Sequence, residues 1–204
     1  MSIQIYIGPM YAGKTTKLIH MYTNIDSVNK IIIDYDNTTY SNQQNDNIFH
    51  SSMQTHDGVV APNVYKCKNL KSLFNIDTYQ MFSEDIRQYY YNVFQSCEHI
   101  YINECQFFEG LKEFVLKMIS YGKKIYLFGL DGDYKQDLIG ETFQLIPYAS
   151  KVEKITGKCN YCENRSIISY RITNSKEVYL PDANAYVPTC LLCKDSIKCD
   201  ETAL

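Results

Sequence analysis

The sequence predicts an α/β fold in which a parallel β-sheet is flanked by helices and is followed by a small second lobe. Apolar runs alternate with amphipathic segments over residues 1–150, which is typical of strands joined by crossover helices. From Cys159 onward, pairs of cysteines bracket short segments, so residues 151–194 are predicted to form a separate metal-binding lobe. Residues 195–204 form a polar tail.

Four short apolar runs predict the strands, because buried strands of a parallel sheet are apolar on both faces. They are Ile3–Ile7, Ile31–Ile33, Ile100–Ile102 and Ile125–Leu130. Apolar residues at helical spacing predict helices that begin near Gly13 or Lys14, lie within Leu70–Phe94 and cover Leu111–Tyr121. The polar stretch Asp36–Gly58 has little periodicity and is predicted to be a loop.

Composition and charge exclude several classes of protein. With 45% hydrophobic and 21% charged residues, the 204-residue chain is typical of one globular domain, or of one domain with a small lobe. A formal net charge of −3 gives no overall basic field for nucleic acid. No apolar run could span a bilayer, and Lys14 interrupts the first one before it resembles a signal peptide. We therefore expect a soluble, cytoplasmic protein that binds neither nucleic acid nor membrane.

The stretch GPMYAGKT follows the first predicted strand and matches the phosphate-loop pattern G-x-x-x-x-G-K-[ST]. Its glycines let backbone N–H groups approach phosphate oxygens, and the N-terminus of the next helix favours the negative charge. Lys14 is expected to reach the β- and γ-phosphates of ATP, and the Thr15 hydroxyl to ligate Mg²⁺. A chance turn is the alternative, but the flanking strand and helix favour a P-loop NTPase-like fold. The predicted ATP-binding residues of the loop are Gly8, Pro9, Met10, Tyr11, Ala12, Gly13, Lys14 and Thr15.

A carboxylate at another strand end is needed to define a reaction. Ligands bind outside the carboxyl ends of parallel strands, and two predicted strands end in Asn103-Glu104 and in Asp131-Gly132-Asp133. Glu104 is a candidate general base that takes a proton from an attacking hydroxyl or water. The residues leave a second interpretation open, in which the carboxylate caps its strand or pairs with Lys14.

Two C-x-x-C units, with Cys159, Cys162, Cys190 and Cys193, supply the four thiolates of a structural zinc site. Four protein ligands leave no open position, so this zinc would stabilise a lobe that is too small to fold unaided. A redox dithiol is the alternative, but redox motifs of this type sit on a βαβ pattern that is missing here. The other four cysteines, Cys67, Cys97, Cys105 and Cys199, receive no role.

Taken together, these motifs resemble the cytosolic (type II) thymidine kinase family. The similar segments are IQIYIGPMYAGKTTKL, IYINECQFFEG, GLDGDYKQDLIGETFQLIPYASKVEKITGKCNYC and AYVPTCLLC. The resemblance covers residues 2–40 and 99–194, whereas residues 41–98 match poorly apart from Thr55–Gly58. Four motifs in the same order make the resemblance specific.

The resemblance implies ATP-dependent phosphorylation of the thymidine 5′-hydroxyl, which yields dTMP and ADP for DNA synthesis. It implies ATP, Mg²⁺ and structural Zn²⁺, a homotetramer, and feedback inhibition by dTTP. Glu104 becomes the proton acceptor, with Asn103 and Gln106 on the ATP and Mg²⁺ side. The implied thymidine site, including a lid loop rooted in the zinc lobe, consists of Phe107, Leu130, Tyr134, Ser169, Val178, Tyr179, Leu180, Pro181, Asp182 and Tyr186, with Met10 as a further wall.

Three positions depart from the family pattern. Asn103 stands where the family usually has an aspartate that helps to hold Mg²⁺, so the charge is lost while an acceptor oxygen remains. Asp131 and Asp133 are candidates to compensate. Thr39 and Gln136 stand where arginines are common, and the chain has few other arginines, namely Arg87, Arg165 and Arg171.

Two further hypotheses follow from these departures. The first is a kinase with broader deoxynucleoside specificity. The second is a non-catalytic ATP-binding protein whose zinc ribbon contacts nucleic acid, which the loss of charge at Asn103 motivates. Acidic residues are mixed with the basic residues of the ribbon, so no basic stripe supports that second hypothesis.

Overall fold

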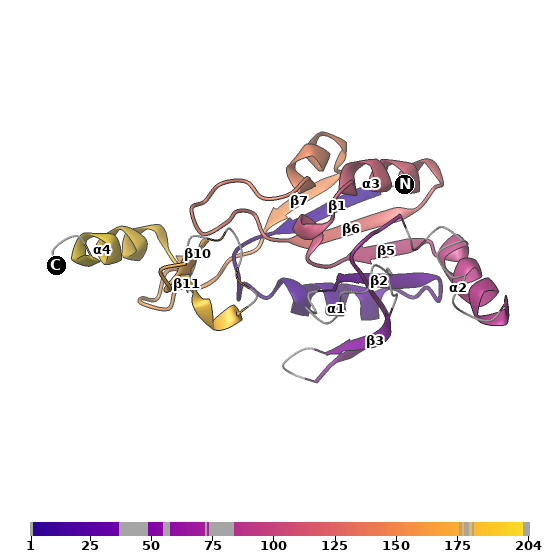
Figure 1. Ribbon diagram of the computed structural model, residues 1–204, viewed down its shortest axis with the longest axis horizontal. Coiled ribbons are helices and arrows are strands. Elements are labelled where there is room, and N and C mark those ends of the chain that lie inside the picture. The colour runs from indigo at the N-terminus through magenta and orange to yellow at the C-terminus, as the bar shows by residue number, and fades with distance from the viewer. Residues whose placement is uncertain are drawn as a thin grey trace.

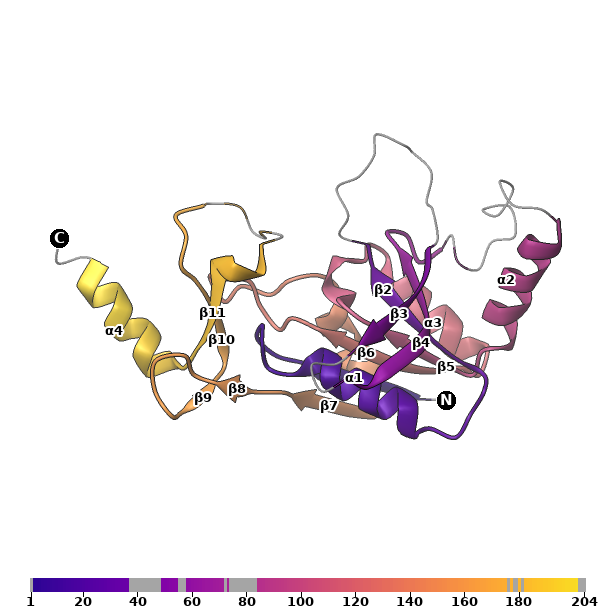
Figure 2. The same ribbon diagram turned by 90° about the horizontal axis from the view of Figure 1, so that it is seen from below.

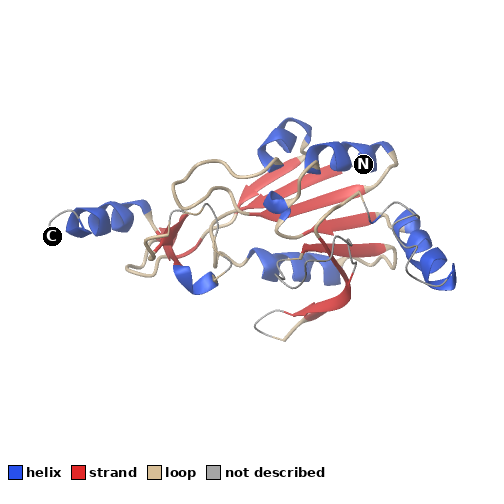
Figure 3. Ribbon diagram, in the orientation of Figure 1, coloured by secondary structure: helices blue, strands red, loops and turns tan. Residues whose placement is uncertain are grey.

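The main body of the chain is one β-sheet with helices on both faces (Figures 1 and 3). This computed structural model describes residues 2–36, 49–54, 58–71, 73, 84–175, 177, 180 and 182–201. Within that part of the chain the sheet has seven strands in the order β3-β4-β2-β5-β6-β1-β7. The predicted α/β fold with a helix-flanked parallel sheet is confirmed.

The strands of the sheet are β1 (Ser2–Ile7), β2 (Lys30–Tyr35), β3 (Phe49–Gln54), β4 (Val60–Cys67), β5 (His99–Ile102), β6 (Lys124–Gly129) and β7 (Lys151–Lys154). Neighbouring strands run parallel, except that β3 is antiparallel to β4. The carboxyl ends of β1, β2, β4, β5 and β6 therefore share one edge of the sheet, where a ligand site is expected.

The two faces of the sheet carry different helices. α1 (Lys14–Asn24) packs its buried residues Leu18, Ile19 and Tyr22 against one face. The other face is covered by α2 (Glu84–Ser96), α3 (Leu111–Ser120) and the 3₁₀ segment η4 (Thr142–Tyr148). The core on each side is continuous apolar packing, which holds the strand ends rigidly in place.

The second lobe lies beyond the phosphate-loop end of α1, at one end of an elongated molecule (Figure 2). Two short hairpins and a 3₁₀ turn build it, followed by a helix: β8 (Gly157–Lys158), β9 (Arg165–Ser166), β10 (Ile168–Arg171), η5 (Ala183–Ala185), β11 (Tyr186–Thr189) and α4 (Leu191–Glu201). α4 continues into the segment that the sequence marks only as a polar tail. No helix in the described residues is both long enough and apolar enough to cross a membrane.

The four predicted strands and the helix Leu111–Tyr121 are confirmed, but the middle of the chain is not as expected. The loop prediction for Asp36–Gly58 is wrong at β3, and β4 was not predicted. β3 pairs only with β4 at an edge of the sheet, where polar side chains are tolerated and hydrophobic periodicity is weak. Of the helical prediction for Leu70–Phe94, α2 covers the last part, while residues 74–83 lie outside the described part of the chain.

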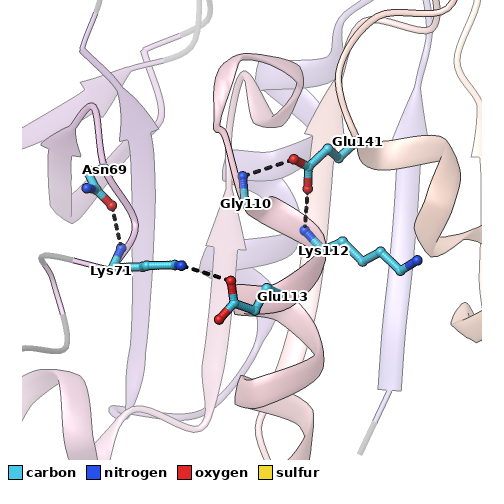
Figure 4. Close-up of polar contacts among 6 residues, drawn as sticks. All are labelled: Asn69, Lys71, Gly110, Lys112, Glu113 and Glu141. Atoms are coloured by element: carbon cyan, nitrogen blue, oxygen red, sulfur yellow. Dashed lines mark hydrogen bonds and ion pairs between the residues drawn. The ribbon is translucent and has the colours of Figure 1, made fainter.

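Glu141 fixes the start of α3 (Figure 4). One carboxylate oxygen accepts the Gly110 N–H at 3.0 Å, and the other accepts the Lys112 N–H at 2.9 Å. Both donors belong to the first turn of a helix, where backbone N–H groups have no partner within the helix. A negative charge here also complements the helix dipole. Nearby, Lys71 and Glu113 form an ion pair at 2.8 Å between two exposed side chains.

The variant Glu141→Ala should lower the free energy of unfolding by about 1–2 kcal/mol, because two backbone donors lose their acceptor. Urea denaturation measures this change. Glu113→Ala is the control: it removes an exposed first-turn carboxylate and its pair with Lys71 but leaves the acceptor of the two backbone N–H groups, so it should destabilise the protein less than Glu141→Ala. An equal loss in both variants would contradict the capping role of Glu141.

Candidate active site

The loop between β1 and α1 depends on its two glycines for different reasons. A Cβ on Gly8 would lie 2.1 Å from the backbone oxygen of Ile155, so no larger residue fits. Gly13 has φ of 84°, in the left-handed region that glycine adopts without strain, and its carbonyl accepts the Lys17 N–H at 3.0 Å. The loop therefore turns sharply into α1, as the phosphate-loop prediction requires.

Lys14 is buried in this loop, with 8% of its surface exposed. Its ammonium donates a hydrogen bond to the Pro9 carbonyl at 2.7 Å. Burial lowers the pKa of Lys14, while the carboxylates of Glu104 and Asp131 act in the opposite direction. One buried cation therefore lies within electrostatic range of two carboxylates from other strand ends, as expected where a triphosphate and a metal ion bind.

Glu104 is held in place by Gln106. Glu104 follows β5 with φ of 48° and precedes the 3₁₀ turn η3 (Cys105–Phe107). The Gln106 amide nitrogen donates to the Glu104 carboxylate at 2.7 Å, and its amide oxygen accepts the Leu130 N–H at 3.0 Å. A Cβ on Gly129 would lie 2.5 Å from that amide oxygen, so only glycine leaves room for Gln106 at this place. The carboxylate therefore has a fixed direction.

Asn103 has a partner that sequence reasoning missed. Its amide nitrogen donates to Asp34 Oδ1 at 2.9 Å, and both residues are buried. Burial raises the pKa of Asp34, whereas the hydrogen bond from Asn103 and the charge of Lys66 act to lower it. The one sequence signal for Asp34 is its place directly after the apolar run Ile31–Ile33.

A small pocket brings together five of the predicted substrate-site residues: Met10, Leu130, Tyr134, Ser169 and Tyr186. They come from the phosphate loop, the segment after β6, and the strands β10 and β11. The Met10 N–H donates to Ser169 Oγ at 2.8 Å, which joins the loop directly to the second lobe.

Phe107 lies outside this pocket. Its ring packs against Tyr35, with ring centroids 5.2 Å apart, and it lines a neighbouring hollow. Of the predicted lid residues, Leu180 and Asp182 are described, whereas Val178, Tyr179 and Pro181 lie outside the described residues, as does Thr39.

Arg171 organises the described part of the lid, and sequence reasoning gave it no such role. Its guanidinium carbon lies 3.7 Å from the Tyr134 ring centroid and 5.0 Å from that of Tyr186. It also donates to the carbonyls of Ser175 and Glu177 and to the Tyr186 hydroxyl.

The same Tyr186 hydroxyl accepts the Leu180 N–H at 2.9 Å. Arg171 thus connects the pocket wall to the chain that approaches it from the lid. Its sequence signal was weak, because a single arginine within a short strand has no distinctive pattern.

The four cysteines of the C-x-x-C units converge in the second lobe. Their sulfur atoms all lie within 4.8 Å of one another, and those of Cys162 and Cys190 are 3.7 Å apart. A tetrahedron of thiolates around zinc has edges of about 3.8 Å, given Zn–S bonds of about 2.3 Å.

The pKa of Cys159 is lowered to about 6: burial opposes the shift, but N–H donors including that of Cys190 outweigh it. The pKa of Cys193 is raised to about 12 by sharing hydrogen bonds with the other thiols, Cys162 first. The geometry and the donor set fit zinc.

A glycine-bounded phosphate loop, a fixed carboxylate at a neighbouring strand end and an adjoining pocket define a P-loop phosphotransferase. A family model for thymidine kinase matches residues 1–194. The thymidine kinase of Amsacta moorei entomopoxvirus is 28% identical over 197 residues, which cover 95% of this chain and 97% of that protein.

Cellular relatives match as well. The thymidine kinase of Oryza sativa subsp. japonica is 32% identical over 194 residues, or 92% of this chain and 64% of that protein. Thymidine kinase 1 of Dictyostelium discoideum is 29% identical over 197 residues, or 95% and 78%. The chain therefore belongs to the thymidine kinase family, and the activity that this membership carries is thymidine phosphorylation.

Metal analysis of the purified chain should find about one zinc per molecule, because four converging thiols match the ligand set. Cys193→Ser should lower the zinc content after dialysis and the midpoint of thermal unfolding, since the metal stabilises the lobe. Cys67→Ser, which changes a buried cysteine of β4 outside the cluster, is the control for zinc content and should keep its zinc. Wild-type protein without zinc would contradict the metal site.

Arg171→Leu should raise KM for thymidine by about tenfold or more, since charged hydrogen bonds contribute about 1.5–3 kcal/mol each. kcat at saturating thymidine should change less, because the contacts of Arg171 are with the pocket wall and the lid. Arg165→Leu is the control, since Arg165 is an exposed arginine of the same lobe. If Arg171→Leu keeps the wild-type KM for thymidine, the contacts of Arg171 do not position the lid.

Proposed function

We propose that this chain transfers the γ-phosphate of ATP to the 5′-hydroxyl of thymidine, with Glu104 as the general base. The observation that carries this proposal is the fixed Glu104 carboxylate, which Gln106 holds at 2.7 Å. A base must be oriented before the substrate arrives, and a rigid amide clamp provides that orientation. The electrostatic influence of Glu104 on Lys14 supports its place beside the phosphate loop.

In this proposal the loop Gly8–Thr15 binds the ATP phosphates through its backbone N–H groups. Lys14 stabilises the negative charge that spreads over the transferred phosphoryl group. Its burial makes that charge effective, because little water screens it. Catalysis of phosphoryl transfer depends mostly on such positioning and charge stabilisation.

The residues at the strand ends fit Mg²⁺, which prefers oxygen ligands. The Thr15 hydroxyl and the Asn103 amide oxygen are the groups that would hold it, either directly or through water. Bound there, Mg²⁺ would offset the negative charge of the β- and γ-phosphates. The amide nitrogen of Asn103 donates to Asp34, so the amide oxygen is the atom that remains available to a cation.

The pocket formed by Met10, Leu130, Tyr134, Ser169 and Tyr186 is the proposed site for the thymine base, and its walls would have to separate, because the present cavity of about 10 Å³ has room for little more than a water molecule. Apolar and aromatic walls with a few polar groups suit a flat, polar heterocycle. The lid, with Leu180 and Asp182 in its described part, would cover the base and exclude water. The zinc lobe would anchor both ends of that lid through the strands β10 and β11.

Phe107 and the three lid residues Val178, Tyr179 and Pro181 remain predictions as substrate contacts. The same holds for the homotetramer, for inhibition by dTTP and for a cytoplasmic location, in the host cell if the source is a virus. Size-exclusion chromatography with light scattering tests the tetramer. Measurement of the phosphorylation rate at increasing dTTP concentration tests the predicted feedback inhibition.

Incubation with ATP, Mg²⁺ and each of the four deoxynucleosides tests the substrate. We expect monophosphate from thymidine at a far higher kcat/KM than from the other three. Comparable rates with several deoxynucleosides would favour the broader kinase instead. ATP binding without any product would contradict the proposed reaction.

Glu104→Gln should lower kcat by about 10²–10⁴-fold, because the glutamine keeps the shape but cannot accept the proton. Affinity for ATP should change little, since the phosphate loop is untouched. Glu109→Gln is the matched control: it lies in the same segment but is exposed, and it should keep its activity. Near-normal turnover of Glu104→Gln would exclude Glu104 as the base.

A further inference from the structure

Three side chains form a polar row at the carboxyl ends of neighbouring strands. Lys66 on β4 is the direct register partner of Asp34 on β2. Asn103 follows β5, the other neighbour of β2, and its N–H donates to the Ile33 carbonyl at 2.8 Å. Strand register thus places the Asp34 carboxylate between a lysine and the asparagine of the proposed cation site.

The hydrogen bond in this row fixes the direction of the Asn103 amide. An ionised carboxylate only accepts hydrogen bonds, so the amide nitrogen must face Asp34 and the oxygen must face away. With aspartate replaced by alanine, nothing in the row would select between the two orientations. A metal ligand whose orientation is fixed by a second residue binds its ion more tightly.

Asp34 is costly as a merely structural carboxylate. Only 12% of its side chain is exposed, and its charged partner Lys66 is 3.8 Å away and 40% exposed. Such a distant, solvated lysine compensates for little of the lost water, so the carboxylate depends mainly on its hydrogen bonds, first that from Asn103 and also that from the Tyr35 backbone. The negative charge of Asp34 lies beside Asn103, whose own side chain is uncharged.

The two carboxylates that the sequence offered as substitutes are engaged elsewhere. Asp131 Oδ2 lies 2.7 Å from the ammonium of Lys154. Asp133 Oδ1 accepts the N–H groups of Lys135 and Asp137 at 2.7 and 3.0 Å, which closes its own turn. Of these three aspartates, Asp34 is the one whose carboxylate contacts the Asn103 side chain in the described structure.

We propose that Asp34 is a positioning residue for the divalent cation that accompanies ATP. It turns the Asn103 amide oxygen toward the cation and supplies, one strand away, the negative charge that position 103 lacks. The inference rests on the proposed phosphoryl transfer, because it concerns the cation of that reaction. In this proposal Asn103 supplies the oxygen ligand and Asp34 supplies the negative charge, so the two residues together do the work of a single aspartate.

Calorimetric titration with a non-hydrolysable ATP analogue tests this role without catalysis. Each protein is titrated once in Mg²⁺ and once in EDTA, and the ratio of the two affinities measures the contribution of the cation. Asp34→Ala, which removes both the charge and the acceptor of the Asn103 N–H, should lower this ratio by about 10-fold or more. Asp34→Asn keeps an acceptor oxygen and should lower the ratio through the loss of charge alone. The affinity in EDTA should not fall, because the metal-free triphosphate gains from the loss of a nearby negative charge, and this shows that the phosphate loop is intact.

Two further variants separate charge from structure. The exchange Asp34→Asn with Asn103→Asp puts the carboxylate back at position 103, and it should restore the ratio. Lys66→Gln removes the lysine of the row and leaves the hydrogen bond, so its ratio should match that of the wild type. A ratio for Asp34→Asn equal to the wild-type ratio would overturn the inference, as would an exchange variant that restores nothing or an equal loss in Lys66→Gln.

A measurement on the wild type covers the case in which Asp34→Asn does not fold. With Mn²⁺ and the ATP analogue, the side-chain NH₂ signal of Asn103 should broaden strongly, and an unbroadened signal would overturn the inference. An assay of thymidine phosphorylation by the wild type distinguishes a failure of this inference from a failure of the proposed function. If thymidine is phosphorylated but the ratio does not depend on Asp34, only the inference fails, whereas inactive wild-type protein contradicts the proposed function itself.

Discussion

The buried ammonium of Lys14 is the constraint on which the rest of the site depends. A lysine with 8% of its surface exposed is unfavourable unless negative groups lie near it. The parallel sheet meets this need, because the carboxyl ends of its strands converge and bring Glu104 and Asp131 into the range of Lys14. The same arrangement places the Lys14 ammonium at the proposed triphosphate site, so the groups that stabilise the loop also belong to the proposed binding site.

Hydrogen bonds that cross between elements give the site its rigidity. Gln106 joins the end of β5 to the end of β6, because one amide accepts from Leu130 and donates to Glu104. Ser169 joins the second lobe to the phosphate loop through the Met10 N–H. Arg171 joins the pocket wall to the lid. Each link joins two elements that are far apart in the chain, so the groups of the proposed site are held in a defined arrangement.

The second lobe is stabilised differently from the main sheet. It contains short hairpins and few buried apolar side chains, so a small hydrophobic core cannot hold it. Four thiols within 4.8 Å of one another provide a cross-link once a metal binds. Because the strands that carry Ser169 and Tyr186 begin and end near this cluster, the cross-link also determines where the walls of the pocket lie.

The sequence by itself determined the parts of the protein that depend on a contiguous segment. The phosphate loop between β1 and α1, the four central strands, α3 and the two cysteine pairs could be read directly, because backbone geometry and local spacing define them. The edge strand β3 was missed because a strand with one partner tolerates polar side chains.

Only the tertiary structure decided which side chains meet across the sheet and between the lobes. The contact of Asp34 with Asn103, the clamp formed by Gln106 and the hub formed by Arg171 follow from strand register and from the docking of one lobe on the other. Residues far apart in the chain leave no periodic signal when they form such contacts, since a single hydrogen bond requires only the right position in space.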